Sequence, residues 1–247
     1  MFPSLGTSFG KLRHLAGLGL CASLGCGGAT PSLPAAEAPE HAELEREPKA
    51  EPELATSAEI GALDEQAAEQ SFRASMDGLQ ACLSQGLQRV AFLGGSIEFA
   101  VKVDAKRNPP RVWAAQSTLG ERATEKCMFE ALRAVPWPKP IGGVSGIARN
   151  SFEFEPRKGA PAPAVWDAGR VWEVLGELEP SLTTCRAEDP GALLVTMYIG
   201  EDGRALSGGV SSMEAVQEET ADCVVETLLA AQFPLPEHSP TKVRFPL

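Results

Sequence analysis

Two stretches of the chain end in the same way, CMFEALRAVPWP over residues 127–138 and CVVETLLAAQFP over residues 223–234. In both, nine residues separate a cysteine from an aromatic residue that is followed by proline. An upstream cysteine and a strand-like run precede each stretch, and a short closing strand follows it. Self-similarity of this kind predicts one architecture used twice. The expected fold is therefore two copies of a small α+β unit.

The first repeat is expected over residues 68–157. Its opening stretch, residues 70–83, places apolar side chains on one face of a helix. These side chains are Phe72, Met76, Leu79 and Leu83. Residues 97–103 alternate apolar and polar side chains, which predicts a strand with one buried and one wet side. The segment 151–154 should close the sheet.

Three local signals predict where these elements begin and end. Two adjacent prolines favour a turn, so Asn108-Pro109-Pro110 is the expected hairpin turn. Ser117 or Thr118 should cap the second helix, because a hydroxyl oxygen can accept a hydrogen bond from the helix's first turn. Pro136 should end that helix, since proline has no backbone N–H to donate.

The second repeat is expected over residues 168–247, after a linker over residues 158–167. Its apolar spacing indicates an amphipathic helix that Pro180 should interrupt. Residues 193–199 alternate as a strand, and Asp202-Gly203 then predicts a hairpin turn in which glycine adopts a positive φ. Two glycine-rich segments match no phosphate-binding spacing and indicate turns; they are residues 142–146 and 208–209.

Six cysteines are present, and two of them lie in the first 26 residues. The remaining four are Cys82, Cys127, Cys185 and Cys223. Four cysteines allow three pairings, and the repeat favours Cys82–Cys127 with Cys185–Cys223, because each unit then carries its own bridge between its two helices. Two pairs of separate buried thiols are the alternative. A zinc site is less favoured, because no CxxC spacing is present.

Residues 1–26 indicate export. A basic segment around Lys11 and Arg13 precedes an apolar run over residues 15–24, which is shorter than the roughly 20 residues that cross a bilayer. The string Ser23-Leu24-Gly25-Cys26 is similar to a bacterial lipobox, so Cys26 is the candidate lipidation site. A signal that is cleaved without lipidation is one alternative, and a chain that stays in the cytoplasm is another.

Residues 27–67 are rich in Pro, Glu and Ala and predict a disordered, extended tether. Between Glu37 and Glu65, ten acidic and two basic residues contribute −8 of the net charge of −11. A negative chain does not neutralise phosphates, which argues against a nucleic-acid partner. It also argues against adsorption to anionic lipid, so we expect membrane contact through the N-terminal lipid only.

The second repeat also contains a set of short motifs in a fixed order. They are Cys185, Asp202-Gly203, Val210-Ser211-Ser212, Cys223-Val224, Phe233-Pro234 and Phe245-Pro246. With this combination, residues 168–247 resemble the AgmX/PglI C-terminal domain. That family is named for myxobacterial gliding-motility proteins and is similar to the C-terminal domain of TonB energy transducers. Residues 69–157 resemble it more loosely.

The resemblance implies two tandem TonB-C-like modules after the tether, each with a three-stranded antiparallel sheet packed by two helices. It also implies attachment to the cell envelope, recognition by strand addition at a sheet edge, and no catalytic residues. TonB-like modules further suggest a link to envelope transport or motility machinery.

Signals for catalysis are weak. His238 is the only histidine beyond the predicted tether, and a nucleophilic triad would depend on it alone. Four carboxylates could act in pairs, but a wet strand face or a turn accounts for each of them: Glu98, Asp104, Glu201 and Asp202. We expect no cofactor and no metal.

The sequence therefore predicts a non-enzymatic binding or scaffold lipoprotein that is exported to the periplasm or cell surface and anchored by lipid to the outer membrane. Its expected partner is an envelope protein, captured by strand addition at a sheet edge. An envelope enzyme, or an enzyme subunit, acting on peptidoglycan or glycan is one alternative. A purely structural lipoprotein is the other.

Overall fold

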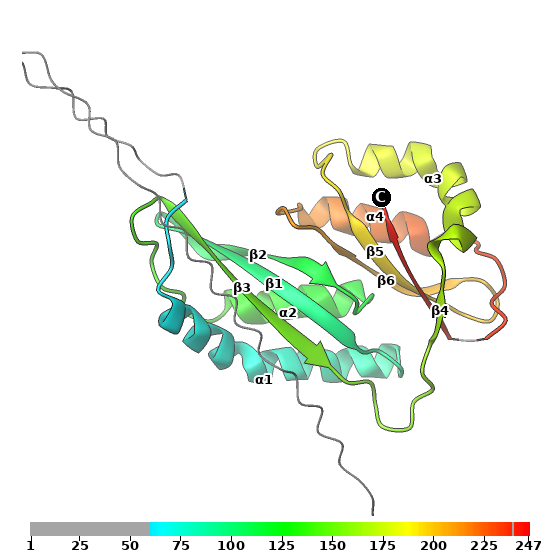
Figure 1. The fold of residues 1–247 in the computed structure, drawn as a ribbon, viewed down its shortest axis with the longest axis horizontal. Helices are drawn as coiled ribbons and strands as arrows, with labels where there is room; N and C mark the ends of the chain where they lie inside the picture. The colour runs from blue at the N-terminus through cyan, green and yellow to red at the C-terminus, as the bar shows by residue number, and fades with distance from the viewer. Residues whose placement is uncertain (1–59, 239) are drawn as a thin grey trace, which may run out of the picture. The chain divides into compact units, whose positions relative to one another are not determined.

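The computed structural model describes residues 60–238 and 240–247, and in this part of the chain it contains four helices and two β-sheets (Figure 1). The helices are α1 (Glu65–Arg89), α2 (Arg122–Arg133), α3 (Trp172–Cys185) and α4 (Glu218–Leu229). The strands are β1 (Gly95–Asp104), β2 (Arg107–Ser117), β3 (Ser145–Phe154), β4 (Ala164–Trp166), β5 (Leu194–Ile199), β6 (Ala205–Ser211) and β7 (Thr241–Pro246). A short 3-10 helix, Ala168–Val171, precedes α3. The α+β prediction is thus confirmed.

The N-terminal half, residues 60–157, contains a three-stranded antiparallel sheet in the order β2-β1-β3. Both α1 and α2 pack on one face of this sheet (Figure 1). The apolar side chains of β1 at Ile97, Phe99, Val101 and Val103 all lie in that core, as their alternation predicts. The helix of residues 70–83 also forms, although α1 extends beyond it at both ends.

Two local predictions for this half are wrong. The hairpin turn is at Ala105-Lys106, and the two prolines lie inside β2. An edge strand tolerates proline because half of its N–H groups point away from the sheet. Glu121 caps α2, since its carboxylate accepts the N–H of Thr124 at 2.7 Å. Ser117 cannot do so because it still belongs to β2.

The C-terminal half, residues 158–247, has the same order of helix, hairpin, helix and closing strand, but its sheet has four strands in the order β4-β7-β5-β6. The extra strand, β4, lies in the predicted linker and pairs in parallel with β7. The linker therefore contributes to the fold, because burial of Trp166 in the second core fixes it against the sheet. The expectation of a three-stranded second sheet is wrong.

Of two further local predictions for this half, one is wrong and the other is confirmed. The helix α3 continues through Pro180, which lies on its exposed side, so the predicted interruption is wrong. The hairpin turn at Asp202-Gly203 is confirmed, and Gly203 has a φ of 74°. A positive φ of this size is readily adopted only by glycine.

Each half contains one disulfide bridge. Cys82 in α1 is bonded to Cys127 in α2, and Cys185 at the end of α3 is bonded to Cys223 in α4. The pairing is the one that the sequence repeat favours. Each bridge therefore links the two helices that cover one sheet.

The end of the predicted tether is folded. Gly61 N–H donates to the carbonyl of Ser145 at 2.6 Å, and Ala62 exchanges two backbone hydrogen bonds with Ile141. Asp64 then caps α1 by accepting the N–H of Ala67 at 2.7 Å. The boundary predicted at residue 67 is therefore too late. The signal segment, Cys26 and tether residues 27–59 lie outside the described residues.

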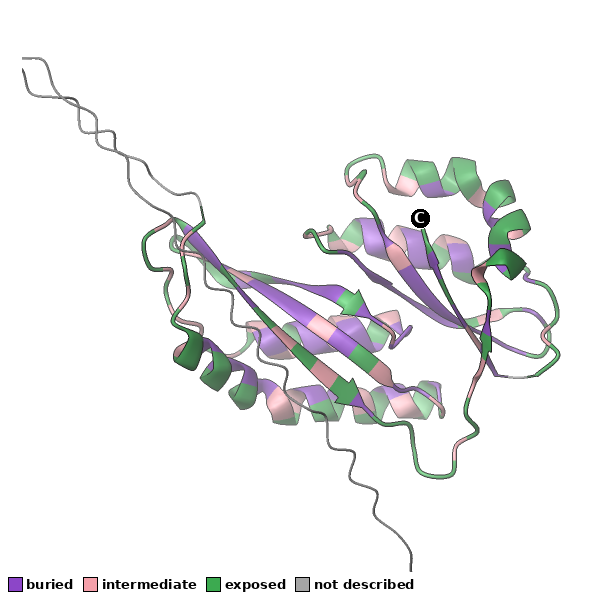
Figure 2. Ribbon diagram, viewed as in Figure 1, coloured by how far each residue is buried: buried purple, intermediate pink, exposed green. Residues whose placement is uncertain are grey.

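A junction joins the two halves, which belong to one compact unit. Most of β5 is buried (Figure 2), and on the face that does not contact α3 and α4 Tyr198 packs against Val90 and Leu93 of the N-terminal half. Tyr198 donates to the carbonyl of Gly94 at 3.2 Å, and Thr196 donates to the carbonyl of Ser117 at 3.1 Å. The wet side predicted for β1 is partly covered too, since Ala100 is buried there beside Trp113.

Candidate functional site

The candidate catalytic residues of the sequence do not converge on one site. His238 is exposed in the loop before β7. Glu98 pairs with Arg149 at 3.2 Å, and Asp202 accepts the backbone N–H of Arg204 within its turn. Among residues 60–238 and 240–247, no three metal-ligating side chains gather, and no helix combines the length and apolarity needed to cross a bilayer.

Three of the tryptophans also lie apart. Trp113 is buried at the junction, and Trp166 is buried in the second core with Arg170 stacked 5.4 Å above its ring. Trp172 is exposed and lines a groove of about 420 Å³ between α3 and the last residues of the chain. The tryptophans therefore form no shared binding surface.

The sheet edges differ in how far they are covered. The outer edges of β2 and β6 meet at the junction, where Ser212 N–H donates to the carbonyl of Ala114 at 3.0 Å. In the second sheet, β4 covers the first half of β7, and Pro246 in the second half has no N–H. The remaining long edge in the described part of the chain is β3.

The outer edge of β3 presents unpaired backbone groups. The carbonyl of Ser145 faces outward, because Gly61 binds it on the side away from β1. Strand geometry turns every second residue to the same side, which places the backbone N–H and C=O groups of Ile147, Arg149, Ser151 and Glu153 outward as well. These four residues are exposed, and no residue of the described ranges hydrogen-bonds their backbone groups.

A groove of about 370 Å³ runs between this edge and α1. Its apolar lining comes from Leu63, Ala68 and Phe72, and its helix rim carries Glu65 and Glu69. At one end of the edge, four large apolar side chains are exposed. They are Ile60, Ile141, Val144 and Ile147. They lie in the segment before α1, in the loop before β3 and at the start of β3, and β-bridges join the first segment to the other two. The edge therefore lies beside apolar surface on two sides.

Arg149 fixes the centre of β3 to the rest of the molecule. Its guanidinium donates to Glu98 of β1 at 3.2 Å and to the carbonyl of Met213, in the C-terminal half, at 3.3 Å. The edge is therefore held in place before any partner arrives. A preformed edge lowers the ordering cost of binding.

The sequence did not single out β3 as the open edge. It predicted only residues 151–154 of this strand, within which Phe154 lies in the first core and Phe152 packs against it. A longer alternation was present, since Ala148, Asn150 and Phe152 face inward between exposed neighbours. The coverage of the other edges depends on the junction and on β4, which no local pattern revealed.

Comparison with known proteins adds no further constraint. The chain matches no family model, no curated protein and no solved structure.

Proposed function

We propose that this chain is a non-enzymatic binding or scaffold lipoprotein of the cell envelope that captures a partner protein by strand addition at β3. The observation that carries the proposal is the unpaired edge from Ile147 to Glu153, beside an apolar groove. Main-chain hydrogen bonds to such an edge provide affinity, and pockets for alternate side chains provide specificity. A bound strand would place every second side chain over Ala68 and Phe72.

Three features support a location in the envelope. Both disulfide bridges fit an oxidising compartment, because thiols stay reduced in the cytosol. Residues 1–26 have the pattern of an export signal that ends in Cys26. Cys26 is the proposed lipidation site, and its lipid would anchor the chain to the outer membrane. The motifs shared with the AgmX/PglI C-terminal domain point to TonB-C-like modules and to a partner in envelope transport or motility machinery.

Proline at Ser151 should weaken capture of the partner at least tenfold. The substitution removes one outward N–H donor and places a ring where the incoming strand would lie. A tenfold loss corresponds to about 1.4 kcal/mol, the size of one good hydrogen bond. A photo-crosslinking residue at position 151 in intact cells first identifies the bound segment, and a synthetic peptide of that segment then gives the Kd for each variant.

Val165→Pro is the matched control. Val165 is the central residue of β4, it is exposed, and it lies on the outer edge of the other sheet. This variant should bind the peptide within about twofold of the wild type. Equal losses in both variants, or crosslinks at position 165 but none at 151, would refute capture at β3. Circular dichroism of each variant confirms that the protein is folded.

A further inference from the structure

Glu125 lies at the centre of the junction with its carboxyl group fully buried. Ser117, at the end of β2, donates its hydroxyl to Glu125 Oε1 at 2.7 Å. On the other side lies Gly209 of β6, where an added Cβ would stand 2.5 Å from Oε1 and 2.8 Å from Oε2. The carboxyl group therefore fills the space of a missing side chain. The prediction that Gly208-Gly209 forms a turn is wrong, because these glycines lie within β6 and admit Glu125.

The surroundings leave this carboxyl group without a counter-ion of its own. Arg122, on the same helix, is bonded to Asp222 of α4 at 2.7 Å and to the carbonyl of Glu218 at 3.2 Å. Glu121 is held by Arg89 of α1 at 2.7 Å. The facing positions of β2 and β6 contribute Ser117, Gly209 and Val210, none of them charged, and Oε2 makes no hydrogen bond of normal geometry.

Burial raises the pKa of Glu125 to about 7. The hydrogen bond from Ser117 and the charge of Arg122 oppose this rise, the charge of Glu121 adds to it, and the backbone N–H of Val210 lowers the pKa slightly. A buried carboxyl group without an ion pair favours its neutral form. The ionised form of Glu125 is therefore unfavourable in free energy only while the two halves stay packed together and keep water away from it.

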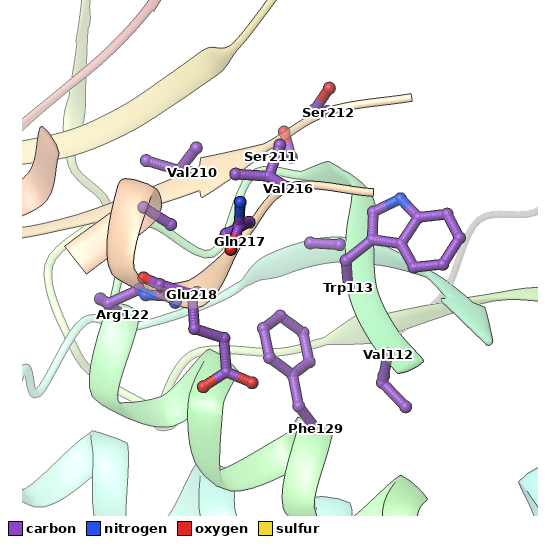
Figure 3. A pocket seen from close by; sticks show the side chains of 12 residues that line it. Val112, Trp113, Arg122, Phe129, Val210, Ser211, Ser212, Val216, Gln217 and Glu218 are labelled. Carbon is purple, nitrogen blue, oxygen red and sulfur yellow. Dashed lines mark hydrogen bonds between the residues drawn. The ribbon is translucent and has the colours of Figure 1, made fainter. Parts of the chain in front are cut away.

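A second part of the junction has both apolar and polar side chains and surrounds a cavity of about 20 Å³ (Figure 3). Side chains of α2 and of the segment from β6 to α4 line it together, among them Phe129, Val216 and Glu218. Arg133 pairs with Glu218, and Lys126 pairs with Asp222 at 2.6 Å. These contacts are ion pairs and small apolar patches rather than one continuous core, as in interfaces whose two sides can separate.

We propose that Glu125 is a proton-operated latch between the two halves: its protonated carboxyl group keeps the junction closed, and loss of the proton loosens it. Opening would release the outer edges of β2 and β6, which the junction covers. These edges would then be available to a partner only when the Glu125 carboxyl group is deprotonated.

The expected direction follows from the two protonation states. The pKa of Glu125 is about 7 when the junction is closed and near its ordinary value of 4.5 when it is open. The closed form therefore binds the proton more tightly, and the closing equilibrium constant falls on the order of 10²-fold as the pH rises from about 4.5 to above 7.

The neighbouring titrations lie outside this pH window. Burial raises the pKa of Asp222, but Lys126 and Arg122 outweigh that effect and hold it below its ordinary value, so its ion pairs persist until more acidic pH. Burial, together with the charge of Arg244, lowers the pKa of Lys242 to about 8. The neutral form of Lys242 favours closure, so this residue acts in the opposite direction and at higher pH.

Amide hydrogen exchange of the full chain, followed by NMR at about pH 5 and about pH 8, tests the latch. The Ser212 N–H reports on the junction, because its acceptor is the carbonyl of Ala114 in the other half. Its protection factor should fall on the order of 10²-fold in the wild type between these pH values. The Val195 N–H, inside the second sheet, should keep its protection at both pH values.

Glu125→Gln and Glu125→Met remove the titration, and Ser212 should then stay protected at both pH values. Gly209→Ala should expose Ser212 at both, because its methyl group displaces the carboxyl group. A wild-type Ser212 whose protection does not change with pH, or falls in step with that of Val195, would refute the latch, as would Glu125→Gln behaving like the wild type. No partner is needed, so this result is independent of strand capture at β3.

Discussion

Replacing Phe99 by alanine should lower the free energy of unfolding by about 3–5 kcal/mol, the range for removing a buried aromatic ring. Phe99 is fully buried at the centre of the first core. Its ring lies 6.2 Å from Phe129 in an edge-on arrangement and 5.7 Å from Phe152, so alanine leaves a cavity lined by two rings from different elements. Because α2 holds one of these rings and β3 the other, the cavity cannot collapse easily.

Urea denaturation with the disulfides intact measures this loss. The control is Trp172→Ala, which removes a larger ring that is 48 % exposed and should cost about 1 kcal/mol or less. A Phe99→Ala variant that loses no more than this control would contradict the assignment of β1 to a packed core. If the slope of the free energy of unfolding against urea concentration is unchanged, the substitution lowers stability without changing the cooperativity of unfolding.

Removing the Cys82–Cys127 bridge, with serine at both positions, should cost about 4 kcal/mol by loop-closure reasoning. The bridge closes a loop with a sequence separation of 45, which includes all of β1 and β2. Without it, the unfolded chain gains freedom while α1 and α2 keep their other contacts. Urea denaturation under non-reducing conditions gives the difference.

The second bridge is an internal control for that reasoning. Cys185–Cys223 closes a loop with a sequence separation of 38, so its removal should cost the same within about 0.2 kcal/mol if loop closure dominates. A difference of several kcal/mol between the two double variants would contradict the entropic account. It would show instead that strain or packing around one bridge decides its contribution.

The strand and helix patterns predicted the two cores well because both cores are local. Ile97 to Val103 and Val195 to Ile199 alternate against helices of their own half, and the hairpin at Gly203 depends on one glycine. The cysteine pairing followed from the repeat. These features need no knowledge of how distant parts of the chain pack.

The features that the sequence did not reveal depend on contacts between the halves or on short segments. Tyr198 occupies a position that alternation assigns to solvent, and only the junction explains its burial. Gly209 resembles a turn residue until Glu125 is placed against it. The three residues of β4 are too few to show a period, and its pairing with β7 is non-local.

The open edge and the latch assign different tasks to different parts of the fold. At β3, an edge held by its pairing with β1 is always available, whereas the edges of β2 and β6 are covered for as long as the junction is closed. Partner capture at β3 should therefore vary little between about pH 5 and about pH 8, while exposure at Ser212 changes.

Amide hydrogen exchange along β3, with and without the peptide identified by crosslinking at position 151, tests strand capture most directly. In the free protein, the outward N–H groups of Ile147, Arg149, Ser151 and Glu153 should exchange quickly, and those of their inward neighbours, bonded to β1, should exchange slowly. Bound peptide should slow exchange of the outward set, so that outward and inward amides are then both protected. Outward amides that stay fast while the peptide protects residues around the Trp172 groove would contradict capture at β3.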